Sequence, residues 1–206
     1  MKIDWYFDFI SPFAYIQHVM LANNHPEVKV NPIPVVFGGL LQHHTHKGPA
    51  EIPLKRIMTY RYCQWYADKH DIPLRFPDVH PFRPILPLRL CISQGSTPQI
   101  ISAIFNTIWV EGKDLNDANN LQNFCEQHGI GEVEQAVSRQ DVKDQLKQNT
   151  DQAIALGAFG VPTISVKGEL FWGVDMLELA VAYLEHPDMF ESEKYSRLTS
   201  LQSALW

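Results

Sequence analysis

Cysteine is scarce in this sequence, and closely spaced cysteines are lacking altogether. The 206 residues contain three cysteines, Cys63, Cys91 and Cys125, and no Cys-x-x-Cys pair. Such an odd and scattered set is typical of buried apolar thiols in a reducing compartment, and it argues against a disulfide framework or a cysteine-based metal site. We therefore expect a cytoplasmic location and no bound metal.

Long hydrophobic runs and an excess of positive charge are also lacking. No apolar stretch approaches the ~20 residues of a membrane span, and the first residues form a strand-like segment with Asp4 and Asp8 where a signal peptide would be apolar. The net charge of −6 at pH 7 disfavours nucleic acid and anionic membranes as partners. With 45% hydrophobic residues, the composition predicts an ordinary globular protein with a sizeable core.

Strand-like patterns occur only near the two ends of the chain. The segments with this composition are residues 2–9, 28–37, 160–166 and 170–172. Between residues 40 and 139 the strand signal is almost absent and apolar side chains recur at helical spacing, after a polar loop predicted for residues 40–53. The chain is thus predicted to be α/β, with a discontinuous domain over residues 1–39 and 140–206 and an all-helical insertion over residues 40–139.

The dipeptide Ser11-Pro12 marks the point where the first strand-like segment passes into a helix. Ser11 can accept hydrogen bonds from free N–H groups of the first helical turn, and Pro12 falls where a missing N–H costs nothing. The start of a helix presents N–H donors and the positive end of the helix dipole, so it favours an anion such as a thiolate. Taken alone, these two residues favour a simpler interpretation, a helix start without chemistry.

Three histidines, His43, His44 and His46, lie in the polar stretch that follows the second strand-like segment. Imidazole is a common metal ligand. However, adjacent histidines point apart on most backbones, and no nearby cysteine or carboxylate pair completes a coordination site. This cluster therefore does not change the expectation that no metal is bound.

Three motifs carry a resemblance to one family. They are Ser11-Pro12-Phe13-Ala14-Tyr15, the strand start Gly160-Val161-Pro162-Thr163, and Phe171-Trp172-Gly173-x-Asp175. Together they resemble the 2-hydroxychromene-2-carboxylate isomerases, which are close to the kappa-class glutathione transferases within the DsbA-like thioredoxin superfamily. The middle of the chain is similar too, at Gly38-Gly39, Pro53-x-Lys55 and Ile72-Pro73. The resemblance therefore covers nearly the whole chain and implies a thioredoxin-like fold with inserted helices.

The resemblance implies glutathione as the cofactor and Ser11 as the catalytic residue. Redox relatives carry two cysteines where this chain has Ser11 and Ala14, and a serine cannot exchange disulfides. A serine hydroxyl at a helix N-terminus can instead donate to the thiolate of bound glutathione and lower the pKa of that thiol.

Further residues are implied to bind glutathione: Val161, Pro162, Val174, Asp175 and Lys55. The peptide bond before Pro162 is usually cis in this fold, which lets the backbone of Val161 pair with an extended ligand. The start of the last helix, near Val174 and Asp175, would hold the α-carboxylate, and Asp175 would take the ammonium group. Lys55 would bind a carboxylate of glutathione or of the substrate. Taken singly, Asp175 and Lys55 are also ordinary residues of a helix start.

Four side chains are implied to contact the substrate: His46, Phe13, Tyr60 and Trp65. Tyr60 and Trp65 would wall its pocket, although aromatic residues at helical spacing commonly belong to a core. His46 stands where family members often have asparagine, and it can add acid–base capacity near neutral pH. Val174 and Met176 stand where family members often have a polar residue and an arginine, respectively, so these positions of the pocket depart from the family pattern.

The implied function is glutathione-dependent cis–trans isomerisation of an aromatic-pathway substrate of the 2-hydroxychromene-2-carboxylate type. A thiolate adds to a conjugated carbon, the new single bond rotates, and elimination returns the other isomer. Two alternatives stay open: a kappa-like glutathione transferase that conjugates electrophiles, and a non-catalytic thioredoxin-like module that binds peptides beside Val161–Pro162. A homodimer is expected by analogy with the family.

Two structural expectations follow. The Val161–Pro162 peptide bond should be cis and should lie beside the Ser11–Pro12 turn. The inner face of the helical insertion should close over the same turn.

Overall fold

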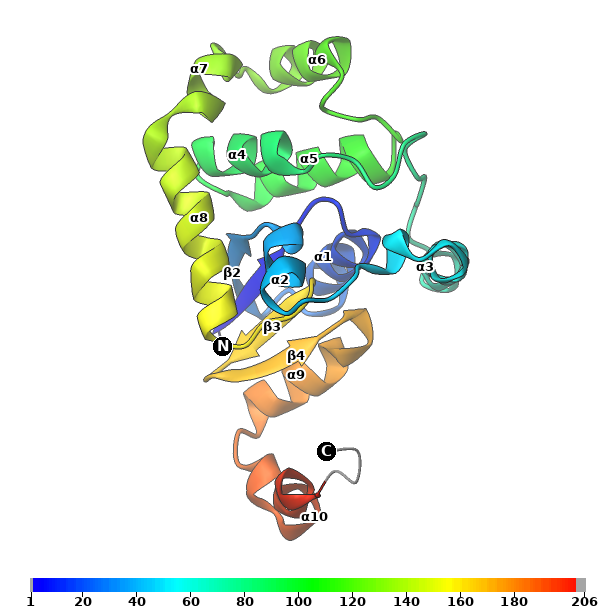
Figure 1. Ribbon diagram of the computed structural model, residues 1–206, viewed down its shortest axis with the longest axis vertical. Coiled ribbons are helices and arrows are strands. Elements are labelled where there is room, and N and C mark those ends of the chain that lie inside the picture. Colours follow the sequence, from blue (N-terminus) through cyan, green and yellow to red (C-terminus); the bar gives the residue numbers. More distant parts are fainter. Residues whose placement is uncertain (1, 203–206) are drawn as a thin grey trace.

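The computed structural model describes residues 2–202, which fold around one mixed sheet of four strands (Figure 1). The strand order is β2–β1–β3–β4. The strands are β1 (Lys2–Phe7), β2 (Lys29–Pro34), β3 (Thr163–Val166) and β4 (Glu169–Trp172). β1 and β2 are parallel and connected through helix α1 (Pro12–Asn24), whereas β3 and β4 form an antiparallel hairpin. This is the arrangement of a thioredoxin-like fold.

Helices make up most of the rest of the described chain. The longer ones are α2 (Phe37–His43), α3 (Pro53–Lys69), α4 (Ile85–Ser93), α5 (Pro98–Trp109), α6 (Ala118–His128), α7 (Val133–Ser138), α8 (Gln140–Ala155) and α9 (Leu177–Glu185). The short ones are η1 (Pro49–Glu51), η2 (Val174–Met176), η3 (Met189–Glu191), α10 (Glu193–Ser196) and η4 (Arg197–Ser200). Residues 40–139 contain no strand, as predicted. None of the helices in residues 2–202 is long and apolar enough to cross a membrane.

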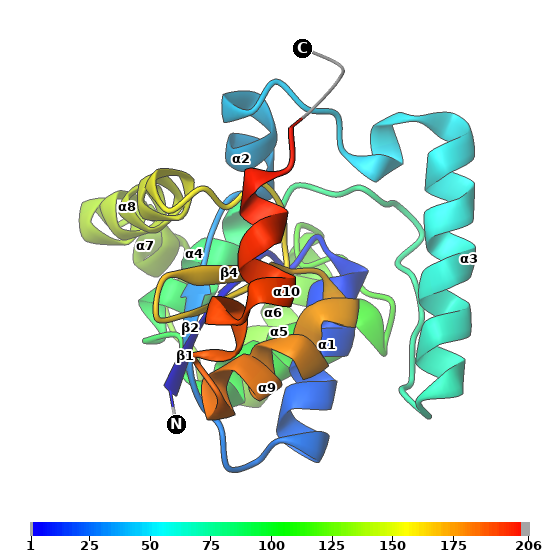
Figure 2. The same cartoon turned by 90° about the horizontal axis from the view of Figure 1, so that it is seen from below.

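The alternation of side chains along β1 sorts the helices onto two faces of the sheet. Ile3, Trp5 and Phe7 are buried in a large core with residues of α1, α5 and α9. Tyr6 points the opposite way, as successive strand residues do. It lies in a smaller core that also contains Leu40 of α2, Ala153 of α8, and Ala158 and Val161 after α8. Figure 2 shows α1 and α9 together, away from α2 and α8. The sheet is therefore covered on both faces.

Helix α2 corrects the loop predicted for residues 40–53. Phe37 to His43 form a helix that includes Gly38-Gly39 and the first residues of this predicted loop. The Phe37 N–H donates to the buried Asp8 carboxylate at 2.9 Å, which supplies a cap from another part of the chain. Leu40 is fully buried against the sheet. Tertiary contacts thus overcome a weak local helix signal.

The helices α4 to α7 lie beyond one end of the sheet (Figure 1) and share its core. Phe105 of α5 is fully buried, and the centre of its ring lies 4.7 Å from that of Phe9 and 5.8 Å from that of Phe7. By contrast, α3 stands at the side of the molecule (Figure 2), and its only fully buried residues are Cys63 and Ala67. Because one hydrophobic cluster runs through both parts, the predicted domain boundaries stay a prediction.

Candidate functional site

The register of the sheet brings two of the three motifs together. β1 ends at Phe7, and the chain then turns into α1 at Ser11. β3 runs antiparallel to β1 and begins at Thr163, so Val161 and Pro162 lie at the end of the sheet where β1 finishes. The Val161–Pro162 peptide bond is cis, as predicted. Val161 is buried, yet neither its N–H nor its C=O takes part in the hydrogen bonds found within residues 2–202.

The third motif reaches the same end of the sheet through β4. The Gly173 N–H, directly after this strand, donates to the Pro162 carbonyl at 2.9 Å. The buried Gln17 of α1 donates through Nε2 to the Gly173 carbonyl at 2.9 Å and accepts from Trp5 at 2.8 Å. Gly173 has a φ of +101°, and a Cβ there would lie 2.6 Å from Oδ1 of Asp175. Glycine is therefore required for the Asp175 carboxylate to fold back over this turn.

Ser11 is the N-cap of α1, and it is almost completely buried, with 7% of its surface exposed. Its Oγ accepts from the Ala14 N–H at 3.2 Å. No acceptor for the Ser11 hydroxyl hydrogen is found within residues 2–202, so the hydroxyl can still donate to a ligand. The first turn of α1 carries no acidic side chain, which leaves the positive end of the helix dipole uncompensated. The arrangement favours an anion at Ser11.

The backbone N–H groups of the turn before Ser11 are held by Asp8. Its carboxylate accepts from Ile10 at 3.1 Å and from Phe37 at 2.9 Å, and its carbonyl accepts from the Ser11 N–H at 3.1 Å. Complete burial raises the pKa of Asp8 to about 7, although the N–H donors oppose this shift. A carboxyl group that titrates near neutral pH thus lies three residues from Ser11.

The carbonyl groups of the same turn accept from two aromatic N–H donors of the helical region. Trp109 Nε1 donates to the Phe9 carbonyl at 2.9 Å, and His80 Nε2 lies 2.8 Å from the Ile10 carbonyl. The helical region therefore does contact the turn, as predicted. Sequence reasoning missed both residues, because His80 lies in an irregular proline-rich stretch and Trp109 has the periodicity of a core residue.

Three of the implied substrate residues lie around α3. The ring of Phe13 is half-buried, 6.0 Å from that of Tyr62. Trp65 stacks on Tyr62, with 5.8 Å between the centres of the two rings, and 54% of its surface is exposed. The Tyr60 hydroxyl lies 2.5 Å from His80 Nδ1, so it is already hydrogen-bonded within the protein. Phe13 of α1 and the aromatic residues of α3 thus face one another near Ser11.

His46 and Lys55 are both exposed. His46 follows α2, 5.9 Å from the ring of His44, and Lys55 lies in the first turn of α3. Within residues 2–202, neither side chain forms a hydrogen bond or an ion pair with the Ser11 turn. Across the same range, no three side chains with metal-binding groups gather at one point.

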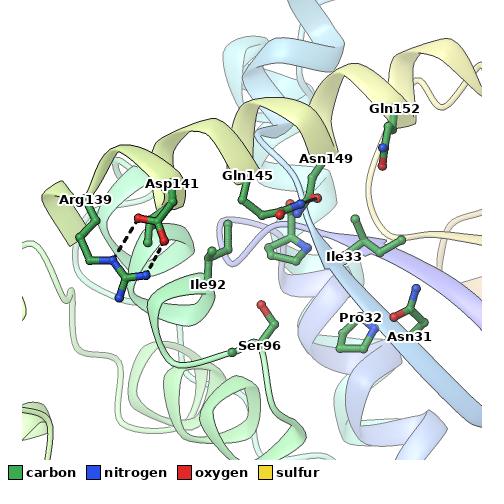
Figure 3. A pocket seen from close by; sticks show the side chains of 13 residues that line it. Asn31, Pro32, Ile33, Ile92, Ser96, Arg139, Asp141, Gln145, Asn149 and Gln152 are labelled. Atoms are coloured by element: carbon green, nitrogen blue, oxygen red, sulfur yellow. Dashed lines mark hydrogen bonds and ion pairs between the residues drawn. The ribbon is translucent and has the colours of Figure 1, made fainter. Parts of the chain in front are cut away.

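The structure contains a cavity of about 540 Å³ between β2 and α8 (Figure 3). It is lined by polar side chains such as Ser96, Gln145 and Asn149, with the Arg139–Asp141 ion pair at one end. None of its lining residues belongs to the three motifs. A smaller apolar cavity, of about 310 Å³, includes Trp172 and Met176 and adjoins the Asp175 turn.

Comparison with known proteins agrees with this architecture. The model of the DSBA-like thioredoxin domain matches residues 2–185. A 2-hydroxychromene-2-carboxylate isomerase of Sphingobium xenophagum is 27% identical over 190 residues, covering 88% of this chain and 97% of that protein. Glutathione S-transferase kappa 1 of Caenorhabditis elegans is 24% identical over 221 residues, covering 97% of this chain and 98% of that protein.

Solved structures share the fold. A 2-hydroxychromene-2-carboxylate isomerase aligns with a TM-score of 0.77 at 23% identity, covering 94% of this chain and 100% of that chain. The cytosolic disulfide reductase DsbM from Pseudomonas aeruginosa with GSH aligns with a TM-score of 0.57 at 17% identity, covering 97% of this chain and 100% of that chain. At these identities the likeness shows the fold alone.

Proposed function

The chain belongs to the DSBA-like thioredoxin domain family, and we propose that it is a glutathione-dependent isomerase that acts on a conjugated aromatic substrate. Relatives over nearly the whole chain are named isomerases and glutathione transferases, which supports an enzyme. The substrate proposed is of the 2-hydroxychromene-2-carboxylate type. The Ser11 turn, Val161–Pro162 and the Asp175 turn form the active site in this proposal.

One observation carries the proposal. The Ser11 hydroxyl is free to donate to a thiolate, and none of the cysteines of this chain can supply that thiolate. Cys63, Cys91 and Cys125 are free and buried, and burial raises the pKa of Cys63 and Cys91 to about 12. Such thiols are inert as nucleophiles near neutral pH. A nucleophilic sulfur at Ser11 must therefore arrive with a ligand.

The groups around Ser11 fit glutathione. The unpartnered N–H and C=O of Val161 suit the backbone of an extended peptide ligand. The free N–H groups at the start of η2 suit its α-carboxylate, and the exposed Asp175 suits its ammonium group. Lys55, on the exposed side of α3, is proposed to bind a carboxylate.

Bound glutathione would supply the thiolate for reversible addition to a conjugated carbon, with rotation about the resulting single bond and elimination. Ser11 donates its hydroxyl hydrogen to this sulfur and keeps it ionised. Phe13, Tyr60 and Trp65 contribute aromatic surface on the substrate side, and His46 supplies a hydrogen-bonding ring. The roles of Phe13, Tyr60 and Trp65 are proposed from their position around α1 and α3, whereas that of His46 rests on the resemblance alone.

The test is turnover of a 2-hydroxychromene-2-carboxylate with and without glutathione. We expect turnover only with glutathione, and Ser11→Ala should reduce kcat by ~10²–10³ because one donor to the anion is lost. Thr97→Ala is the matched control, because Thr97 caps α5 in the same way, accepting from the Ile100 N–H. It should lose a similar ~1 kcal/mol of stability but retain activity.

Product analysis separates the remaining alternatives. Release of the isomer with free glutathione supports the isomerase, whereas a covalent glutathione adduct as the final product supports the conjugating transferase. Peptide binding without glutathione binding would overturn both and favour the non-catalytic module.

We also propose a homodimer that covers the exposed side of α3. Leu54, Met58 and Trp65 are 77%, 70% and 54% exposed, and Ile57 adjoins them at 45%. Contiguous apolar surface of this kind is uncommon on a monomer. Light scattering of the purified chain measures its mass directly.

A further inference from the structure

The tautomer of His80 follows from its two hydrogen bonds. Nε2 lies 2.8 Å from the Ile10 carbonyl, which can only accept, so Nε2 carries a hydrogen. In the neutral ring Nδ1 then accepts, and its donor is the Tyr60 hydroxyl, which lies 2.5 Å from Nδ1 and 3.0 Å from the His80 carbonyl. Burial lowers the pKa of His80, in agreement with a neutral ring. One imidazole therefore donates to the Ser11 turn and accepts from α3.

The ring of His80 is fixed in place by aromatic neighbours. Its centre lies 5.4 Å from that of Trp109, 5.9 Å from that of Phe76 and 6.0 Å from that of Phe82. Trp109 is fully buried and holds the preceding carbonyl, that of Phe9. Trp109 and His80 thus donate to consecutive carbonyls of the turn. Of these two residues, only His80 also connects the turn to α3, through Tyr60.

From this geometry we propose that His80 is a positioning residue for Ser11, a role that rests on the function proposed above. The Ile10 carbonyl belongs to the peptide group that enters Ser11, so its hydrogen bond fixes the plane of that peptide and hence the position of the Ser11 hydroxyl. Without the donor, only the hydrogen bond from the Ser11 N–H to the Asp8 carbonyl holds this peptide group, and its plane is freer to rotate. A displacement of about 1 Å at a reacting group can reduce a rate by ~10²-fold.

Two amide variants separate the two hydrogen bonds of His80. In His80→Gln, the amide nitrogen reaches the position of Nε2 and can still donate to the Ile10 carbonyl, but the ring acceptor for Tyr60 is lost and only the carbonyl of residue 80, 3.0 Å from the Tyr60 hydroxyl, remains. In His80→Asn, the amide oxygen replaces Nδ1 and can accept from Tyr60, but the side chain is too short to reach Ile10. Each variant is therefore the matched control for the other.

The kinetic test compares these variants at equal folded fraction. His80→Asn should lower kcat by about 10- to 100-fold, with little change in KM for glutathione, and should raise the pKa of the bound glutathione thiol. His80→Gln should recover most of both losses. Equal kcat and equal thiol pKa in the two variants would overturn the proposal.

A readout without glutathione keeps this inference separate from the proposed function. The Ser11 N–H donates to the Asp8 carbonyl within the turn, so its hydrogen exchange reports on the order of the turn in the free protein. Exchange should accelerate in His80→Asn and stay near the wild-type rate in His80→Gln. If wild-type protein shows no glutathione-dependent turnover, the proposed function fails on its own; equal exchange in both variants contradicts the positioning role whatever the activity.

Discussion

The Ser11 turn and helix α3 lie side by side but are held in very different ways. In the turn, Asp8 holds N–H groups, and Trp109 and His80 hold carbonyls. Helix α3 has 17 residues, of which only Cys63 and Ala67 are fully buried, and its outer side is apolar and exposed. The turn that would hold the thiolate is thus fixed by hydrogen bonds from other segments, whereas the helix that would meet the substrate is anchored by few buried side chains.

The largest expected effect compares the core beneath the turn with the surface of α3. Phe105→Ala should lower the free energy of unfolding by ~3–5 kcal/mol, because its buried ring contacts Phe7 and Phe9. Leu54→Ala, made together with Met58→Lys so that the proposed dimer contact is absent, removes a side chain that is 77% exposed and should change this free energy by at most ~0.5 kcal/mol relative to Met58→Lys alone. Urea denaturation of these variants measures both values, and similar losses would contradict the contrast.

The second prediction concerns Asp8, which holds the turn from within. Burial raises its pKa from 3.8 to about 7, so between these values the folded protein keeps a proton that the unfolded chain releases. Stability from this group is therefore complete below about pH 4 and is lost as pH rises toward 7, by up to ~4 kcal/mol.

Asp8→Asn should remove this slope, because an amide does not titrate. The free energy of unfolding, measured by urea denaturation between pH 4 and pH 8, would show it as the difference between the two profiles. Parallel profiles for wild type and variant would mean that Asp8 is ionised throughout and that burial does not control its charge.

The smallest effect on folding is expected on the outer side of α3. Met58→Lys places a charge on a side chain that is 70% exposed, so the folded subunit should lose at most ~0.5 kcal/mol. If this side forms the dimer, light scattering should show a monomer for the variant and a dimer for wild type. A wild-type monomer, or a variant that remains dimeric, would refute this interface.

The sequence predicted those features of the site that depend on neighbours along the chain. Ser11 does cap α1, the bond before Pro162 is cis, and residues 40–139 contain no strand. Each has a local signal: a serine before a proline, a proline at the start of a strand, or the spacing of apolar residues.

The contacts that hold the turn have no such signal. His80 meets Ile10 across 70 residues and Trp109 meets Phe9 across 100 residues. The helix over Gly38-Gly39 was missed for the same reason, because its cap is the distant Asp8. Tyr60 was predicted to wall the substrate pocket, and only the fold shows that its hydroxyl is bound to His80.

Ser11 is proposed to keep a glutathione thiol ionised, and the pKa of that thiol in the complex measures this directly. Thiolate absorbance would be followed against pH for wild type, Ser11→Ala and the control Thr97→Ala. We expect a thiol pKa well below that of free glutathione in wild type and in Thr97→Ala, and a rise of about one unit or more in Ser11→Ala because a donor to the charged form is lost. An identical thiol pKa in all three proteins would contradict this role of Ser11.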